Sequence, residues 1–301
     1  MPKKILITGA DGFIGQHVFS LLQAAGFIVT GISFEGGKID KAKILKLDLC
    51  QAAKVARFFK KNHFDIIVHL AARVPRTDDY VSQKLSLIKN TISTLNILEE
   101  FRKSKTEKFI YASGTTVIGT PKNTLPVNEL HPANPESLYT AGKYFGEVLC
   151  EYYQKKYQKD VVILRISAPY GPGQSPNNVI PIFIRAALDS KEIHVFGTGK
   201  RSQDFIYIDD VARAFLAAIK CDKSGIYNIG SGRSTSTLSL AKIILKNVPK
   251  SQSKVVFTGK DHQENYRLKM DISKAKKDLK FVPKIMIEEG IKKYVKNCHN
   301  F

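Results

Sequence analysis

Short apolar runs alternate with longer amphipathic stretches through the first half of this 301-residue chain. Runs such as Ile5–Ile7 and Ile66–Val68 are typical of strands buried on both faces, whereas residues 80–102 carry apolar side chains at helical spacing. This alternation predicts a parallel sheet with helices on both faces. The expected strands are 3–8, 27–33, 44–47, 65–70, 108–112 and 161–166, and the expected helices are 13–25, 51–61, 80–102 and 137–157.

The pattern changes after Arg165, where residues 168–176 form a loop rich in proline and glycine. Shorter elements are expected at 178–189, 193–196, 204–207, 209–220, 226–229, 238–246, 254–257 and 271–279. We therefore predict an α/β fold, a doubly wound parallel sheet with a smaller C-terminal α/β lid that binds substrate. The sheet domain covers 1–167 with returns near 204–225, and the substrate-binding domain comprises 168–203 and 226–301.

Three glycines that follow the first expected strand indicate a ligand-binding turn within this fold. Gly9 follows Thr8 directly, and Gly12 and Gly15 open the first helix. Gly9 permits a tight turn, Gly12 lets the backbone approach a phosphate, and Gly15 lets the helix pack closely on the strand. A helix N-terminus placed after such a turn attracts the pyrophosphate of a dinucleotide.

The formal net charge is +20, and most of the excess is lysine spread over expected helices and loops. The best explanation of this positive charge is that the lysines lie on solvated faces, and the second is that they attract an anionic dinucleotide or sugar nucleotide. No nucleic-acid partner is expected, because no recognition motif accompanies the charge. The four cysteines lie far apart, which predicts neither disulfides nor a metal site. The chain lacks a leading targeting segment and an apolar run long enough to span a bilayer, so we expect a cytoplasmic protein.

Tyr139 and Lys143 are spaced to share one face of the expected helix 137–157. A lysine ammonium and a positively charged cofactor ring favour the phenolate and thereby lower the pKa of a tyrosine. Tyr139 could then exchange a proton with a sugar hydroxyl while Lys143 holds the cofactor ribose. The loop after strand 108–112 adds hydroxyls that could assist this proton transfer, and its candidates are Ser113, Thr115 and Thr116.

These features together resemble the extended short-chain dehydrogenase/reductase family, in its NAD-dependent sugar-nucleotide epimerase/dehydratase branch, and especially UDP-glucose 4-epimerase-like members. The resemblance extends over nearly the whole chain. It rests on 8–15 (TGADGFIG), Asp48-Leu49, 69–72 (HLAA), Asn90 with Thr94 and Asn96, Tyr139 with Lys143, 178–181 (NVIP), 194–197 (HVFG), 203–210 (QDFIYIDD), 227–232 (YNIGSG) and 271–275 (DISKA).

The resemblance implies a Rossmann-type fold, bound NAD with NADP left open, a nucleotide-diphosphate sugar as substrate, and no metal. The implied cofactor contacts are Gly9, Asp11, Gly12, Phe13, Ile14, Gly15, Ser33, Asp48, Leu49, Leu70, Ala71, Ala72, Asn90, Lys143 and Ile166. The implied substrate contacts are Asn178, Val179, His194, Phe196, Arg201, Gln203 and Arg267. It also implies a homodimer through helices around 88–102 and 139–156, in which Leu95, Leu98, Phe145, Leu149 and Tyr153 supply apolar positions.

The chain departs from the family pattern at two places that bear on the reaction. Ser33 stands where NAD-preferring members carry an acid for the ribose 2′-hydroxyl. Gly114 stands where many members carry the catalytic serine or threonine, so Ser113 or Thr115 would supply the hydroxyl. The two residues after Gly114 are threonines, whereas dehydratases and decarboxylases carry carboxylates there, so elimination and decarboxylation are disfavoured.

Three hypotheses remain from the sequence. The first is a UDP-hexose 4-epimerase that works through a 4-keto intermediate. The second is an NAD(P)H-dependent reductase of a 6-deoxy-4-keto sugar nucleotide, which the absence of an acid at Ser33 favours. The third is a non-catalytic dinucleotide sensor, which the intact Tyr139 and Lys143 pair disfavours.

Overall fold

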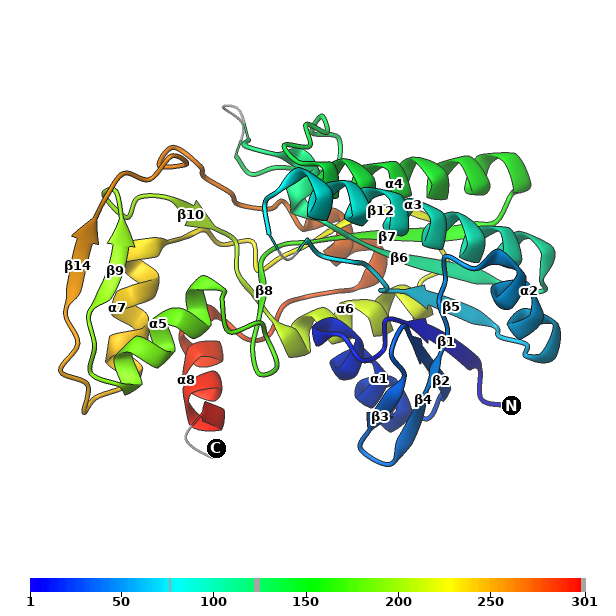
Figure 1. Ribbon diagram of the computed structural model, residues 1–301, viewed down its shortest axis with the longest axis horizontal. Helices are drawn as coiled ribbons and strands as arrows, with labels where there is room; N and C mark the ends of the chain where they lie inside the picture. The colour runs from blue at the N-terminus through cyan, green and yellow to red at the C-terminus, as the bar shows by residue number, and fades with distance from the viewer. Residues whose placement is uncertain (76, 122–124, 299–301) are drawn as a thin grey trace.

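An eight-stranded sheet forms the larger half of the molecule, in the order β12-β7-β6-β5-β1-β2-β4-β3 (Figure 1). The computed structural model describes residues 1–75, 77–121 and 125–298. All neighbouring strands run parallel except β3, which pairs antiparallel to β4. The strands are β1 (Lys4–Thr8), β2 (Ile28–Ser33), β3 (Gly37–Ile39), β4 (Ala42–Lys46), β5 (Ile66–His69), β6 (Lys108–Gly114), β7 (Asp160–Ile166) and β12 (Gly225–Ile229).

Helices cover both faces of this sheet because successive strand residues point to opposite sides. Leu6 packs into a core with side chains from α2 (Ala52–Lys61), α3 (Tyr80–Lys103) and α4 (Leu138–Tyr157). Its neighbours Ile5 and Ile7 pack on the other side with α1 (Phe13–Ala24) and α6 (Ile208–Lys220). Figure 1 shows α3 and α4 on one side of the strands and α1 and α6 on the other. The doubly wound parallel sheet predicted from the apolar pattern is confirmed.

The smaller half is built around a two-stranded parallel sheet of β9 (Ile193–Phe196) and β14 (Val255–Thr258). The apolar core on the α1 and α6 side of the large sheet continues into this half without interruption. Among the described residues, no helix has both the length and the apolar character needed to cross a membrane. The remaining elements of the smaller half are β8 (Pro169–Tyr170), α5 (Val179–Leu188), β10 (Ser202–Gln203), β11 (Ile206–Tyr207), β13 (Thr235–Ser236), α7 (Thr237–Asn247), the short helix η2 (Ala275–Leu279) and α8 (Ile287–Cys298).

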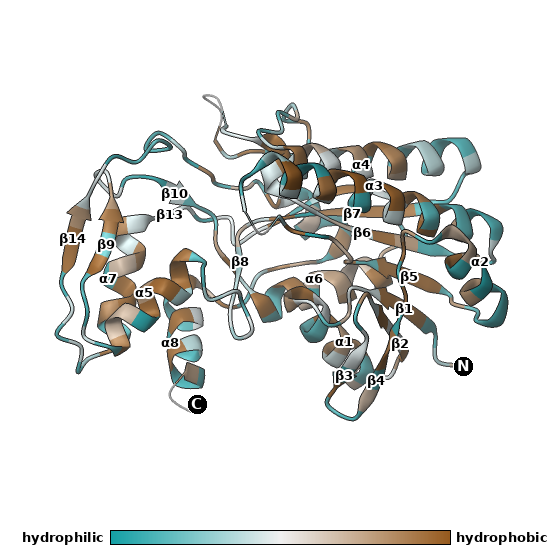
Figure 2. Cartoon of the chain, viewed as in Figure 1, coloured by the Kyte–Doolittle hydropathy of each residue, from teal (hydrophilic) through white to brown (hydrophobic). Residues whose placement is uncertain are grey.

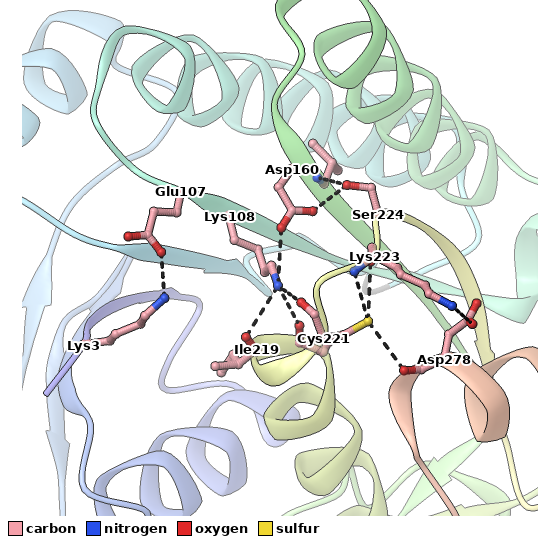
Figure 3. Close-up of polar contacts among 11 residues, drawn as sticks. Lys3, Glu107, Lys108, Asp160, Ile219, Cys221, Lys223, Ser224 and Asp278 are labelled. Atoms are coloured by element: carbon pink, nitrogen blue, oxygen red, sulfur yellow. Dashed lines mark hydrogen bonds and ion pairs between the residues drawn. The ribbon is translucent and has the colours of Figure 1, made fainter.

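A buried lysine ties the amino-terminal end of β6 to the end of α6 (Figure 3). The Lys108 ammonium donates to the carbonyls of Ala218, Ile219 and Cys221, and it lies 3.3 Å from a carboxylate oxygen of Asp160. The last carbonyls of a helix have no partner within the helix, so this cation satisfies them and complements the helix dipole. The contact fixes the end of the sheet opposite to the candidate site.

The structure differs from the sequence prediction in several elements and at one domain boundary. The hairpin strand β3 was not expected, and neither was α8. The short element expected at 271–279 is helical from residue 273 to 279, and the Asp271 carboxylate accepts a hydrogen bond from the Ser273 amide just before it. The predicted domain boundary at 226 cuts through β12, which pairs with β7 from Gly225 to Ile229 and therefore belongs to the large sheet.

Candidate active site

The turn between β1 and α1 leaves no room for side chains at two glycines. Gly9 has a φ of +66°, and a Cβ on it would lie 2.7 Å from the Cα of Ala71. A Cβ on Gly15 would lie 2.1 Å from the carbonyl oxygen of Gly9. Gly12 caps α1 without a side-chain hydrogen bond, so the first N–H groups of the helix are left to a ligand. The cradle fits a pyrophosphate that approaches the backbone closely.

A pocket opens beside this turn, between the carboxyl ends of β1, β2 and β5, where the strand order reverses direction. Such switch points are where doubly wound sheets bind ligands. Eight of the predicted cofactor residues line this pocket: Gly9, Asp11, Ser33, Asp48, Leu49, Ala71, Ala72 and Asn90. The other predicted residues lie outside its lining: Gly12, Phe13, Ile14 and Gly15 open α1, Leu70 follows β5, Lys143 lies on α4, and Ile166 ends β7.

Buried polar side chains hold the walls of this pocket in place. The His69 ring lies 2.7 Å from the Thr8 hydroxyl and 3.1 Å from the Thr94 hydroxyl, and burial lowers its pKa to about 3. A neutral imidazole can donate at one nitrogen and accept at the other, which suits a bridge between two hydroxyls. The Thr8 hydroxyl also accepts a hydrogen bond from the Ala71 amide. This histidine therefore joins β1, β5 and α3 as a structural group.

Two asparagines of α3 complete the walls. The Asn90 amide bridges both backbone groups of Arg73: its oxygen accepts from the Arg73 N–H at 2.7 Å, and its nitrogen donates to the Arg73 carbonyl at 3.1 Å. Asn96 donates to the Leu49 carbonyl at 2.8 Å. Each asparagine thus positions a pocket loop through the backbone. The motifs identified both residues, and the contact of Asn90 with the cofactor stays a prediction for a residue that lines the pocket.

At the end of β2, the pocket is lined by Ser33, an uncharged residue, at the position where an acidic residue would contact the cofactor ribose. The Ser33 hydroxyl accepts a hydrogen bond from the Gly36 amide at 2.9 Å. Next to it, the half-exposed Phe34 ring lies 5.4 Å from the Lys89 ammonium. Sequence reasoning missed the lining residues Phe34, Leu47, Cys50, Arg73, Lys89 and Ser93. Most of them directly follow or precede a predicted site residue, so adjacency was the signal available.

The predicted Tyr139 and Lys143 pair lies on the first turns of α4. Ser137 and Thr140 cap this helix reciprocally, which fixes where its first turn begins. The buried Lys143 ammonium donates to the Ala112 carbonyl at 2.5 Å and lies 4.7 Å from the centre of the Tyr111 ring. Burial lowers the pKa of Lys143 to about 8. The lysine is therefore anchored to the end of β6.

The expectation that Lys143 lowers the pKa of Tyr139 is wrong for the protein alone. Burial of the phenol raises the pKa of Tyr139 above its ordinary value of 10.0. The physical reason is that the ammonium is turned toward Ala112 and Tyr111, while desolvation disfavours the phenolate. Activation of Tyr139 must therefore come from groups that arrive with the ligands or from a neighbouring hydrogen-bond donor.

The two predicted catalytic hydroxyls are both buried, and one of them has a hydrogen-bond partner within the protein. The Ser113 hydroxyl donates to the Glu147 carboxylate at 2.5 Å, and that carboxylate is paired with Arg165 at 2.7 Å. Thr115 is 4% exposed and begins the short helix η1 (Thr115–Ile118). The assignment of these two residues as the reacting hydroxyls stays a prediction. It is the weaker for Ser113, whose hydroxyl faces α4 and the buried ion pair.

A second cavity, of about 640 Å³, opens in the smaller half between α5 and β9. Five of the predicted substrate residues line it: Val179, His194, Phe196, Arg201 and Gln203. Asn178 is exposed at the N-cap of α5, and its neighbour Asn177 lines the cavity instead. Arg267 lies outside this lining, and one of its guanidinium nitrogens donates to the Glu264 and Tyr266 carbonyls, so its contact with the substrate stays a prediction.

Comparison with known proteins places this geometry in a family. The model of the "NAD dependent epimerase/dehydratase family" matches residues 5–230. The chain belongs to the NAD dependent epimerase/dehydratase family. A relative from Methanocaldococcus jannaschii, provisionally named a UDP-glucose 4-epimerase, is 35% identical over 97% of each chain. A Bos taurus dTDP-D-glucose 4,6-dehydratase is 29% identical, over 99% of this chain and 90% of the relative.

A solved structure gives the same result. UDP-glucuronic acid 4-epimerase from Bacillus cereus, crystallised with UDP-glucuronic acid and NAD, superposes with a TM-score of 0.87 at 29% identity and covers 99% of both chains. This member of the epimerase/dehydratase family is therefore an NAD-dependent sugar-nucleotide enzyme with a Rossmann-like fold. The family resemblance predicted from the motifs is confirmed. Epimerases and dehydratases both occur among its relatives, so the reaction must be argued from the site.

Proposed function

We propose that this enzyme interconverts the C4 epimers of a UDP-hexose through a 4-keto intermediate. The observation that carries the proposal is the uncharged segment at the end of β6, where Gly114 is followed by Thr115 and Thr116 of η1, which packs against the helix of Tyr139 and Lys143. Elimination of water from the sugar needs an additional acid and base at the reacting carbons. Epimerisation at C4 needs only a hydride carrier and one group that removes and returns a proton.

Bound NAD would supply the acceptor and donor of that hydride, held by the glycine turn and the pocket lined by Asp48 and Ala71. Tyr139 removes the proton from the sugar hydroxyl and later returns it. Lys143 holds its charge beneath the site from its anchor on Ala112. The cavity lined by Phe196 and Arg201 accepts the nucleotide, with an aromatic face for the base and a cation for the diphosphate.

The test is turnover of UDP-glucose and UDP-galactose by the purified protein, with and without added NAD. Tyr139→Phe should lower kcat by about 10²- to 10⁴-fold, since the variant lacks the proton-transfer group. The matched control is Tyr144→Phe, on the same helix, whose half-exposed side chain makes no described contact with the site. Absence of turnover of any UDP-hexose would exclude the proposal.

A second candidate is an NAD(P)H-dependent reductase of a 6-deoxy-4-keto sugar nucleotide. Ser33 favours it, because its uncharged hydroxyl places no negative charge against a 2′-phosphate. The cofactor released from the denatured protein separates the two candidates. Stoichiometric NAD supports an epimerase that recycles its cofactor, whereas an empty protein that consumes NADPH with a 4-keto sugar supports the reductase.

We also propose that the enzyme forms a homodimer through the outer faces of α3 and α4. Apolar side chains repeat along both helices, which lie side by side (Figures 1 and 2). The exposed members are Ile88, Ile92, Leu95, Phe145 and Val148. Leu98 and Tyr153 are buried against the sheet and Leu149 is partly buried there, so of the predicted positions only Leu95 and Phe145 are available. Sedimentation equilibrium should give twice the 33.6 kDa chain mass, and Phe145→Glu should halve it.

A further inference from the structure

The reacting sugar oxygen needs a hydrogen-bond donor besides Tyr139, because burial raises the pKa of that phenol and no charged group faces it in the protein alone. Three hydroxyls follow Ala112 on β6 and η1. Ser113 is committed to Glu147, and Thr115 is buried. Thr116 is the exposed one.

The Thr116 hydroxyl lies close to Gly114. A Cβ built on Gly114 would have the Thr116 hydroxyl oxygen as its nearest neighbour, at 3.5 Å, and the Ile166 carbonyl next, at 3.7 Å. Both are ordinary van der Waals distances. The Thr116 hydroxyl therefore borders the space that a side chain at Gly114 would occupy, at the carboxyl ends of β6 and β7.

The surrounding contacts place this space beside the proposed proton-transfer pair. Helix α4 packs against η1, which contains Thr116. Lys143 is anchored on the carbonyl of Ala112, two residues before Gly114. The carbonyl that anchors the lysine and the Thr116 hydroxyl therefore both lie at the carboxyl end of β6, within two residues of Gly114 along the chain.

We propose that Thr116 donates the hydrogen bond to the reacting oxygen of the sugar, in the space left open by the missing side chain of Gly114. This inference rests on the proposed function in one respect, namely that a sugar oxygen gains and loses charge at this site. A neutral hydroxyl can donate to the oxygen as charge develops and pass a proton toward Tyr139, without removing a proton from carbon. The same role would serve 4-epimerisation and reduction of a 4-keto sugar.

The experiment compares Thr116→Val, Thr116→Ser and the double variant Gly114→Ser with Thr116→Val. Thr116→Val should lower kcat about 10²-fold, while UDP-hexose binding measured by calorimetry changes less than threefold. Thr116→Ser should stay within a few-fold of the wild type. The double variant should recover most of the loss, because a serine side chain at Gly114 meets only ordinary contacts.

A second readout separates a hydroxyl at the reacting oxygen from a structural role. In Thr116→Val, the pH of half-maximal kcat should move upward, because the hydroxyl that relays the proton from the sugar oxygen to Tyr139 donates to the phenolate during that relay and is then missing. Loss of binding together with kcat, or an unchanged pH profile, would overturn the inference. A larger loss in Thr115→Val than in Thr116→Val would overturn it as well and assign the hydroxyl to Thr115.

Failure of the proposed function is distinguishable from failure of this inference. If the wild type reduces a 4-keto sugar with NADPH and epimerises nothing, the epimerase proposal fails. The ratio of the kcat of Thr116→Val to the kcat of the wild type in the reductase assay then tests the role of Thr116 in the same way. If the wild type turns over neither class of substrate, both proposals fail.

Discussion

Replacing Lys143 by methionine should change the stability of the protein in a way that depends strongly on pH. Methionine has a similar length but no charge, so it fits the buried site between Ala112 and Tyr111. The lysine is 7% exposed, and burial lowers its pKa from 10.5 to about 8. The native protein therefore holds this proton less tightly than the unfolded chain does.

The sign of the effect follows from proton linkage. Between pH 8 and pH 10.5 the unfolded chain binds more protons at this lysine than the native protein, so the lysine's contribution to stability rises with pH. At pH 7 burial of the ammonium costs about 3 kcal/mol, because one pKa unit corresponds to about 1.4 kcal/mol. At pH 10 most native molecules carry the neutral amine, and the cost falls to about 1 kcal/mol.

Urea unfolding of the cofactor-stripped protein at pH 7 and pH 10 measures this difference. The free energy of unfolding of Lys143→Met relative to wild type should decrease by about 2 kcal/mol from pH 7 to pH 10. The control is Lys156→Met, an exposed lysine of the same helix, for which the difference should be the same at both pH values. A pH-independent difference for Lys143→Met would refute the argument that this lysine is held in a desolvating site.

Two further predictions concern the packing of α4. Gly146→Ala should destabilise the fold by about 1–3 kcal/mol, since its Cβ would lie 2.1 Å from the Tyr111 hydroxyl. Gly142→Ala should change stability by less than about 1 kcal/mol, since its Cβ would lie 3.1 Å from the Leu87 side chain and 3.3 Å from the Leu87 Cα, and helix propensity offsets that crowding. Equal unfolding midpoints would contradict this. Glu147→Gln should cost about 3–5 kcal/mol in urea unfolding, because it leaves the 4% exposed Arg165 charge buried without its partner. A cost below 1 kcal/mol would show that water or another group compensates that charge.

The sheet and the cofactor turn could be predicted because each rests on local patterns. The two apolar faces of β1 follow from the unbroken apolar run of Ile5, Leu6 and Ile7, and the glycine turn follows from steric limits that the spacing of the glycines expresses. Both signals lie within a few residues of one another. Such signals remain readable without knowledge of the tertiary structure.

The fate of individual hydroxyls and cations could not be predicted in the same way. The Ser113 hydroxyl donates to Glu147, which lies 34 residues away, and one guanidinium nitrogen of Arg267 donates to carbonyls of its own loop. The pKa of Tyr139 depends on how deeply α4 buries it. These outcomes depend on long-range packing, which spacing does not encode. Thr116 was among the candidates for the same reason that Ser113 was, and only the fold distinguishes them.

The buried Asp204 carboxylate has a consequence for how this protein can be divided. It lies between β10 and β11, and it accepts hydrogen bonds from the amides of Ser231, Gly232 and Met270. One side chain thus ties together three stretches of chain far apart in sequence. The smaller half is built from separate segments of the chain, because the chain leaves the large sheet after β7, returns to it as β12 and leaves it again. Neither half corresponds to a continuous gene fragment, and a substrate specificity cannot be transplanted to a relative as a single cassette.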